Sequence, residues 1–394
     1  MYIPISTVNK NYAEVTTPDT MTKACILTSS HATFDSRIFH KQARTLAEEG
    51  YDVMLVTPHG ADTKRHGVKV KAVGGGDVSS AGLGDAFDVY RTAKSTNADI
   101  YHFHDPGLLP FGVLLSFTTD AKIVYDCHEQ YEKSLRRYDF PPDVLNPLVG
   151  AYPALQSLAC RRFNAVVTTT EGAAEDFRRR GHSNIMPVRN FPVTDTIRIG
   201  RAPIKRTTER LLVYVGGFDP TRGPRKMLEL ISGLREMDID VGAWLIGPLG
   251  HHEDELQRTA DKKSVSRYVR FVGRVPHEQI FSYLNEADVG LALLDPERFE
   301  QDIPLKLFEY MYAGLPVVTT PIGASERFIH EEWGIIVPFE DAEIQATEVA
   351  ELLADPRRIE RMGREGRQVV EEEYSWKSEK TKLLDLYDDL SSRL

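Results

Sequence analysis

The segment from Gln301 to Val318, QDIPLKLFEYMYAGLPVV, carries the residues best suited to hold a nucleotide diphosphate. Pro304 fits the first turn of a helix, where free backbone N–H groups and the helix dipole attract an anion. Lys306 adds a positive charge at this helix start, and Glu309 follows one turn deeper on the same face. A carboxylate there can accept hydrogen bonds from both hydroxyls of a ribose. The alternative is an ordinary surface Lys–Glu pair, which the apolar helix and its strand-like flanks disfavour.

A second group of polar residues ends strand-like runs in the first half of the chain. His102, His104 and Asp105 end one run, and His128 directly follows another. Because strand side chains alternate, His102 and His104 should point to the same side of the sheet. A metal site is one interpretation of these histidines, and a purely structural role is another. We favour neither on spacing alone.

Asp35 and Arg37 lie in the loop after the first strand-like run, directly before a helical stretch. An aspartate in that position caps a helix by accepting backbone N–H groups. The same two side chains would also lie at the edge of a parallel sheet, where ligands bind. Both roles are open.

An alternating pattern of β-branched runs and amphipathic stretches positions these residues and predicts parallel sheets covered by helices. The stretch 37–50 has helical spacing and ends at Gly50, where a left-handed cap is favourable. Periodicity vanishes between 190 and 209, as in a linker. Strands are expected at 24–29, 52–57, 68–73, 99–104, 122–127 and 165–170, and again at 210–217, 240–247, 268–273, 288–294 and 315–320.

The pattern predicts an α/β protein with two doubly wound, Rossmann-like domains. Ligands of such folds bind outside the carboxyl ends of the strands, so we expect the functional residues there. The predicted parts are a polar extension at 1–21, an N-terminal domain at 22–192, a linker at 193–209, a C-terminal domain at 210–374 and a final helix at 375–394.

The segment 301–318 resembles the donor-binding signature of the family 4 (group 1) retaining glycosyltransferases. Six further segments agree with this family in order and spacing, and together they span most of the chain from about residue 22. The resemblance implies the GT-B fold, with two Rossmann-like domains facing across a cleft and a C-terminal helix that crosses back to the first domain. The segments are SSHATFDSRIFHKQARTLAEEGYDV, DIYHFHDPGLLPFG, YDCHEQYE, VYVGGFDPTRG, YVRFVGRVPHEQIFSYLNEADVGLALL and TPIGASERFI.

The resemblance assigns donor-binding roles to the second domain. The Glu309 position binds the donor ribose, and Arg222 matches a cation that grips the diphosphate. The family usually has arginine where this chain has Gly217, and Lys306 is the candidate replacement. It often has a glutamate where this chain has Gln301, which can bond a sugar hydroxyl but carries no charge. The remaining donor-binding candidates are Gly216, Arg274, Val275, Pro304 and Gly323.

In the first domain, the resemblance places His128 beside the transferred sugar, so His128 and Glu309 are the candidate catalytic residues. It places His104 and Asp105 in the cleft, and it places Asp35 and Arg37 near the acceptor and the diphosphate. These four are the acceptor and cleft candidates. The family needs no metal ion, so neither a metal nor another cofactor is expected.

The implied activity is retaining, metal-independent transfer of a hexosyl or N-acetylhexosaminyl group from a nucleotide-diphosphate sugar. The acceptor would be a glycan, a lipid-linked molecule or a small molecule. No carboxylate stands out as a nucleophile, so we favour same-face attack in which the leaving diphosphate takes the proton of the acceptor. A non-catalytic sugar-nucleotide-binding or scaffold protein of the same fold is the alternative, and a sugar-nucleotide epimerase is a third.

Length and charge set limits on these interpretations. A chain of 394 residues exceeds what one hydrophobic core supports, which predicts two domains. Residues 1–200 contain 22 basic and 22 acidic side chains, so the whole net charge of −10 lies in 201–394. That balance argues against nucleic acid as the main partner.

Three cysteines without metal or redox spacing predict a reducing, cytoplasmic compartment. Arginine clusters in the first half, at 136–137, 161–162 and 178–180, suggest peripheral contact with the inner face of the cell membrane.

Overall fold

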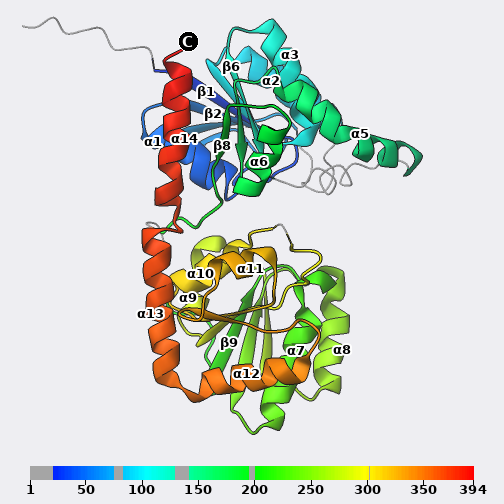
Figure 1. The fold of residues 1–394 in the computed structure, drawn as a ribbon, viewed down its shortest axis with the longest axis vertical. Helices are drawn as coiled ribbons and strands as arrows, with labels where there is room; N and C mark the ends of the chain where they lie inside the picture. Colours follow the sequence, from blue (N-terminus) through cyan, green and yellow to red (C-terminus); the bar gives the residue numbers. More distant parts are fainter. Residues whose placement is uncertain (1–20, 75–82, 129–141, 195–199, 301) are drawn as a thin grey trace, which may run out of the picture. The chain divides into compact units, whose positions relative to one another are not determined.

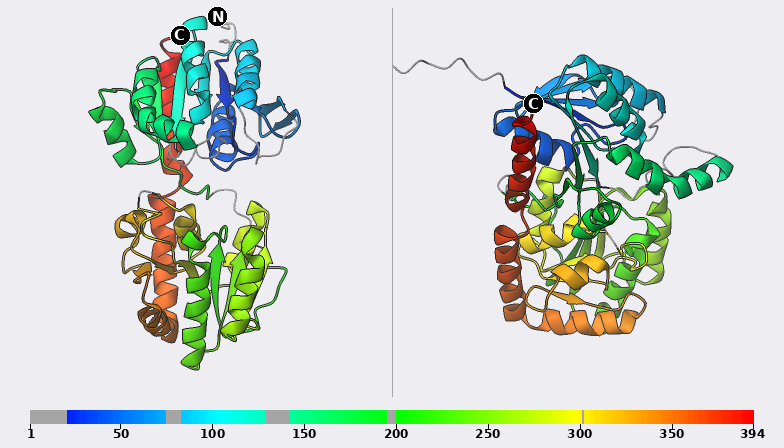
Figure 2. Two further views of the ribbon diagram at one scale, coloured as in Figure 1. Left: turned by 90° about the vertical axis from the view of Figure 1, so that its right-hand side faces the viewer. Right: turned by 45° about the horizontal axis from the view of Figure 1, so that its top comes forward.

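The computed structural model divides into two compact units, each built on its own sheet (Figures 1 and 2). Unit 1 comprises residues 1–188 and 383–394, and unit 2 comprises 189–382. Residues 1–20 of the predicted N-terminal extension, together with Arg136, Arg137 and Gln301, lie outside the described residues. The structure describes residues 21–74, 83–128, 142–194, 200–300 and 302–394.

Unit 1 has an eight-stranded sheet in the order β3-β4-β2-β1-β5-β6-β7-β8. Every neighbouring pair is parallel except β3 with β4. The central strands are almost wholly buried, as expected of a sheet with helices on both faces. The carboxyl ends of β1, β5 and β6 therefore lie side by side. The strands are β1 Lys23–Leu27, β2 Asp52–Thr57, β3 Thr63–Arg65, β4 Val68–Ala72, β5 Ile100–Phe103, β6 Lys122–Cys127, β7 Ala165–Thr168 and β8 Ile185–Pro187.

Helices cover both faces of the unit 1 sheet. On one face, α2, α3, α5 and α6 supply apolar side chains to a core shared with the strands. In Figure 1, α1 and the end of α14 lie on the opposite side of the sheet from α2 and α3. These elements are η1 Ile38–Ala43, α1 Arg44–Glu48, α2 Leu83–Ser95, η3 Pro106–Leu108, α3 Leu109–Thr118, α5 Pro142–Cys160, α6 Glu171–Arg179 and α14 Trp376–Ser391.

The helix predicted over 37–50 begins as a π-helix, η1, before it continues as α1. The carbonyl of Asp35 accepts the N–H groups of both Phe39 and His40, and Gln42 N–H bonds the carbonyl five residues back. This wider spacing inserts an extra residue into the first turns, which hydrophobic periodicity did not reveal. The predicted end at Gly50 is confirmed, with φ of +94°.

Unit 2 has a six-stranded, wholly parallel sheet in the order β11-β10-β9-β12-β13-β14. One face packs on α7, α8 and α12, and the other on α9, α10 and α13. The strands are β9 Arg210–Val215, β10 Val241–Ile246, β11 Val269–Gly273, β12 Val289–Ala292, β13 Val317–Thr319 and β14 Gly334–Ile336. The helices are η4 Pro220–Arg222, α7 Pro224–Glu236, η5 Gly250–His252, α8 Glu253–Lys262, α9 His277–Leu284, α10 Leu305–Tyr312, α11 Gly323–Phe328, α12 Ala342–Ala354 and α13 Pro356–Glu372.

The predicted fold class is confirmed, with two doubly wound parallel sheets and a C-terminal helix that returns to unit 1. The last turns of α14 dock there because Tyr387 is fully buried and its hydroxyl lies 2.9 Å from His102 Nδ1. Strands β3, β8 and β14 were missed. Each has only three residues, too few to show a period.

Candidate functional site

Asp126 is the centre of a buried polar network in unit 1. It lies in β6 and is completely buried. Its Oδ2 accepts hydrogen bonds from Arg37 Nε at 3.0 Å, Arg37 Nη2 at 2.8 Å and Gln42 Nε2 at 2.6 Å. Its Oδ1 lies 3.3 Å from His128 Nδ1. The side chain therefore joins the start of η1 to the end of β6.

Burial and neighbouring charge set the protonation states in this network. Burial alone would raise the pKa of Asp126, but Arg37 and His128 outweigh it and hold the pKa well below its usual range. Burial lowers the pKa of His102 to about 4, and it lowers the pKa of His104 well below the usual value. At neutral pH, Asp126 is therefore ionised while His102 and His104 are uncharged.

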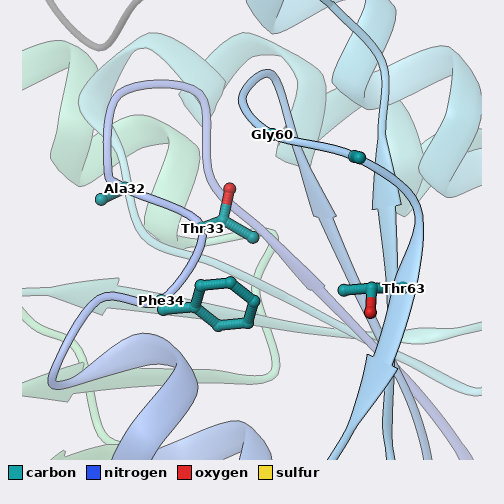
Figure 3. A pocket seen from close by; sticks show the side chains of 6 residues that line it. Ala32, Thr33, Phe34, Gly60 and Thr63 are labelled. Carbon is teal, nitrogen blue, oxygen red and sulfur yellow. The ribbon is translucent and has the colours of Figure 1, made fainter.

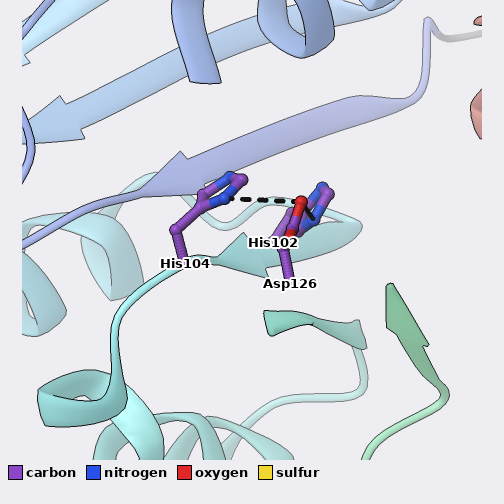
Figure 4. A group of neighbouring side chains, drawn as sticks. All are labelled: His102, His104 and Asp126. Atoms are coloured by element: carbon purple, nitrogen blue, oxygen red, sulfur yellow. Dashed lines mark ion pairs between the residues drawn. The ribbon is translucent and has the colours of Figure 1, made fainter. Parts of the chain in front are cut away.

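His102, His104 and Asp126 form the group most suited to a metal ion among the described residues (Figure 4). Their ligand atoms lie within 4.8 Å of one another, and the two rings stack with centroids 4.8 Å apart, as strand alternation predicts. A cation added here would meet the Arg37 guanidinium, which already pairs with Asp126 Oδ2. The arrangement fits an ion-pair network better than a metal centre.

Asp105 is the second buried carboxylate at this edge. It follows β5 and accepts hydrogen bonds from Thr28 Oγ1 at 2.8 Å, from Ser29 N–H at 2.5 Å and from Ser30 Oγ. Its Oδ1 also lies 2.9 Å from His31 Nδ1. Burial would raise its pKa, but His31 and these donors hold the pKa far below the usual range. Asp105 thus fixes the loop that follows β1.

The structure gathers most of the predicted unit 1 residues at this edge. Arg37, His104, Asp105 and His128 lie in or beside the network, and His128 keeps about 10% of its side chain exposed. Asp35 instead accepts the N–H groups of Arg37 at 2.7 Å and Ile38 at 2.9 Å, which confirms its capping role. Arg37 is nearly buried, and its third donor bonds the Val188 carbonyl at 2.9 Å.

An open pocket with a volume of about 500 Å³ lies beside the loop after β1 (Figure 3). The Phe34 ring is 40% exposed there, and the Arg65 guanidinium lies 5.2 Å from its centroid. Aromatic faces and hydroxyl groups of this kind suit a sugar ring. The lining residues are Ala32, Thr33, Phe34, Gly60, Ala61 and Thr63.

Lys306 is the most unusual residue of unit 2. It is only 6% exposed, and its Nζ has no hydrogen-bond partner among the described residues. The ammonium position lies 4.0 Å from the centroid of the Tyr214 ring. Burial lowers the pKa of Lys306 well below its usual value, and Arg222 lowers it further, although Glu309 opposes this shift. Burial therefore favours the uncharged amine more than it is favoured for a lysine in water.

The predicted helix start at Pro304 is present as α10. Pro304 precedes the first turn, and Lys306 and Glu309 lie on the helix as predicted, with Glu309 only 6% exposed. The Tyr310 hydroxyl accepts the Val215 N–H at 2.8 Å, which ties the helix to the end of β9. This bond positions α10 against the loop that follows β9.

That loop begins with Gly216 and Gly217. Gly216 has a φ of +150°, which favours glycine, and a Cβ there would lie 2.7 Å from Lys306 Nζ and 2.8 Å from the Tyr214 hydroxyl oxygen. A Cβ on Gly217 would meet nothing closer than Arg222 Nε at 3.9 Å. Arg222 ends η4 and pairs with Asp219 at 2.7 Å. The structure thus brings Gly216, Gly217, Arg222 and Lys306 together.

The other predicted donor residues lie at neighbouring positions of the same sheet. Arg274 is exposed and Val275 is half-buried after β11, which is two strands away from β9 in the sheet. Gly323 begins α11, and a Cβ there would lie 2.0 Å from the Glu300 carbonyl oxygen. Close backbone packing therefore explains this glycine.

Sequence reasoning missed Asp126, His31 and Gln42. Asp126 stood inside the strand-like run KIVYDC, and a carboxylate in a buried strand is itself a signal, because such groups are rarely buried without partners. His31 lies in the loop after β1, at the same sheet edge as the predicted residues. Gln42 carried no signal, since only the π-helical turn directs it inward.

Two doubly wound units with polar residues gathered at the carboxyl ends of their strands are the architecture of the GT-B class of glycosyltransferases. Residues 36–191 match the family model "Glycosyltransferase Family 4", and residues 196–369 match "Glycosyl transferases group 1". The chain belongs to this family, the group 1, or family 4, glycosyltransferases. The expected resemblance is thereby confirmed.

Relatives of known name agree with this assignment. The glycogen synthase of Mycobacterium tuberculosis (strain H37Rv) is 25% identical over 385 residues, which cover 89% of this chain and 90% of the relative. The GDP-mannose-dependent alpha-(1-6)-phosphatidylinositol monomannoside mannosyltransferase of Mycolicibacterium smegmatis is 27% identical over 212 residues, which cover 50% of this chain and 54% of the relative.

Solved structures show the same fold at lower identity. The sucrose-phosphate synthase of Thermosynechococcus elongatus matches with a TM-score of 0.76 and 16% identity, over 95% of this chain and all of that chain. HepE of Anabaena, solved in complex with UDP-glucose, matches with a TM-score of 0.67 and 14% identity, over 94% of this chain and 99% of that chain. Among the described residues, no helix has the length and apolar character needed to cross a membrane.

Proposed function

We propose that this glycosyltransferase moves a hexosyl or N-acetylhexosaminyl group from a nucleotide-diphosphate sugar to an acceptor with retention of configuration and without a metal ion. The observation that carries the proposal is Lys306, a buried amine at the start of α10 and beside the glycine loop after β9, which has no hydrogen-bond partner in the described part of the chain. A diphosphate bound at this position would give the amine a negatively charged hydrogen-bond partner. HepE, with the same fold, was solved with UDP-glucose.

In this proposal, unit 2 holds the nucleotide. Glu309 accepts the ribose hydroxyls, and Lys306 and Arg222 bind the diphosphate, with Lys306 in place of the cation that Gly217 lacks. Gly216 allows the backbone to approach the amine closely. Arg274 and Val275 serve the base, and Gln301, Pro304 and Gly323 serve the sugar and the diphosphate. No metal is needed, since these cations stabilise the charge that builds up on the leaving group.

Unit 1 supplies His128 and the acceptor surface. His128 contacts the transferred sugar, while Asp126 holds its ring from the Nδ1 side. The leaving diphosphate accepts the proton of the attacking hydroxyl, so the new glycosidic bond forms on the face from which the nucleotide departs. Asp35, Arg37, His104 and Asp105 act by fixing the loops around this histidine, and the pocket beside Phe34 accommodates part of the acceptor.

A lipid-linked acceptor is supported by exposed apolar side chains on α3 and α5, two helices that pack together. Leu114, Phe117, Leu155 and Leu158 are each at least 41% exposed, and the Arg162 guanidinium lies 4.4 Å from the Phe117 ring centroid. We propose peripheral contact with an anionic membrane through these side chains. Flotation with anionic vesicles, but not with neutral ones, is the expected result, and Phe117→Ser should reduce it.

The test of the central activity is nucleotide release from a panel of radiolabelled UDP, GDP and ADP sugars. Lys306→Ala or Arg222→Ala should lower turnover roughly 10²-fold or more, the effect of losing one such electrostatic contact. Lys226→Ala, which removes a surface lysine of the same unit that pairs with Glu340, is the matched control. Wild-type turnover in both site variants would refute the donor assignment. Binding without release or transfer would favour the scaffold alternative.

A further inference from the structure

Two histidine rings face each other at the carboxyl edge of the unit 1 sheet. His31 lies in the loop after β1, and His128 directly follows β6. Their Nε2 atoms are 3.4 Å apart, and the ring centroids are 5.1 Å apart. Each side chain is slightly exposed, 13% for His31 and 10% for His128. The pair is therefore accessible to a substrate group, unlike His102 and His104.

A buried carboxylate lies near the Nδ1 atom of each ring. His31 Nδ1 lies 2.9 Å from Asp105 Oδ1, and His128 Nδ1 lies 3.3 Å from Asp126 Oδ1. Both carboxylates are completely buried. His31 Nδ1 also lies 3.2 Å from Thr28 Oγ1, whose own hydrogen goes to Asp105, so this Nδ1 is the donor. The 3.3 Å contact of His128 is not a hydrogen bond by geometry, but the ionised Asp126 beside it favours the tautomer with the hydrogen on Nδ1. In the neutral form of either ring, Nε2 then presents a lone pair.

Two lone pairs at 3.4 Å repel each other, whereas one added proton turns the contact into a hydrogen bond. We propose that His31 and His128 act as one unit that holds a single proton between their Nε2 atoms, and that this unit binds a carbohydrate hydroxyl. This inference rests on the proposed glycosyltransferase activity, and it makes His31 a second substrate-contacting residue beside His128. The hydroxyl accepts from the protonated Nε2 and donates to the other one.

The surrounding charges favour one proton on the pair. Among the described residues, the ionised groups around the two rings are Asp105, Asp126 and Arg37. These carry two negative charges and one positive charge, so one shared proton brings the cluster to neutrality. His104 lies 5.5 Å from His128 by ring centroids, and burial keeps both it and His102 uncharged. A phosphate oxygen would instead need two protonated rings, which this balance disfavours.

Histidine-selective 15N labelling of the whole protein tests the shared proton without any substrate. Imidazole 15N shifts, followed from pH 5 to pH 9, should show both Nδ1 atoms protonated throughout. The Nε2 atoms of His31 and His128 should titrate in two linked steps more than one pH unit apart. His31→Asn should return His128 to a single step. His251→Asn, an exposed histidine of unit 2, should change neither curve.

Two results would overturn the inference. One is independent titration of the two rings in the wild-type protein with the same midpoint. The other is stoichiometric Zn²⁺ binding that requires both rings, since a metal ion would then be the cation between them. In turnover assays, His31→Asn should lower kcat/KM about as much as His128→Asn, and the double variant should be no worse. Linked titration without any sugar transfer would refute the proposed activity but leave the proton pair intact.

Discussion

The carboxyl edges of the two sheets of this glycosyltransferase differ in whether a buried ionisable side chain is paired. In unit 1, the charge of Asp126 is paired within the protein, because its Oδ2 accepts hydrogen bonds from Arg37 and Gln42. Its Oδ1 has no hydrogen-bond partner among the described residues, although His128 Nδ1 lies 3.3 Å away. In unit 2, Lys306 is equally buried but its Nζ has no hydrogen-bond partner among the described residues. An amine that stays charged in the interior without a partner costs several kcal/mol, which is why burial lowers its pKa, whereas a paired charge roughly breaks even. We infer that the unit 1 edge is preorganised, and that the unit 2 edge is completed by an anionic ligand.

The largest expected effect comes from breaking the unit 1 network. Arg37→Ala leaves Asp126 buried without its guanidinium, which should lower the free energy of unfolding by about 3–5 kcal/mol. Urea denaturation measures this loss. Arg44→Ala on the adjoining helix breaks the exposed pair with Glu48 and should cost less than about 1 kcal/mol. Equal effects of the two variants would show that the network is no stronger than a surface pair.

The opposite sign is expected for Lys306→Met in unit 2. The described residues offer this buried amine no hydrogen bond, so its removal should leave the free energy of unfolding unchanged or raise it by about 1–3 kcal/mol. Lys226→Met, which breaks a surface pair with Glu340, should instead cost up to about 1 kcal/mol. Urea denaturation of both variants decides the point. A loss above 1 kcal/mol in Lys306→Met would mean that the lysine stabilises the ligand-free fold.

A third contrast lies within the glycine loop after β9. Gly216→Ala puts an alanine at a φ of +150° and a methyl group 2.7 Å from Lys306 Nζ and 2.8 Å from the Tyr214 hydroxyl oxygen, so we expect a loss of about 1–3 kcal/mol in stability from backbone strain and crowding together. Gly217→Ala meets only ordinary contacts and should stay within about 0.5 kcal/mol of wild type. Thermal unfolding of the two variants compares them directly. Equal melting temperatures would argue against a close approach of loop and amine.

The smallest effect concerns the docking of α14 on unit 1. Tyr387→Phe removes the hydroxyl that lies 2.9 Å from His102 Nδ1 and should cost about 1 kcal/mol, the typical value of a buried hydrogen bond. Urea denaturation at pH 7.5 measures it. Tyr51→Phe removes a hydroxyl that bonds the more exposed Asp388, and it should cost less. A larger loss in Tyr51→Phe would contradict the ranking.

From the sequence, the fold and the residues of the site could be predicted better than the hydrogen bonds and ion pairs that join those residues. Strand runs and the α10 signature are local patterns, so β1, β5, β6, Lys306 and Glu309 could be found from spacing. The pairing of Arg37 with Asp126 joins residues 89 positions apart, and the π-helical turn that aims Arg37 and Gln42 inward has no local signature. The positive charge expected on Lys306 was also an oversimplification, since only the packing shows how deeply the amine is buried.

Proton uptake on nucleotide binding tests most directly whether unit 2 is completed by a diphosphate. An anion beside Lys306 should raise its lowered pKa, so between the free and bound values the protein takes up a proton as the ligand binds. Titration calorimetry at pH 8 in Hepes and in Tris measures this, with whichever of UDP, GDP or ADP gives the largest thermal shift. We predict net proton uptake in the wild-type protein and none in Lys306→Gln. Tight binding without proton uptake, or equal uptake in the variant, would contradict the account.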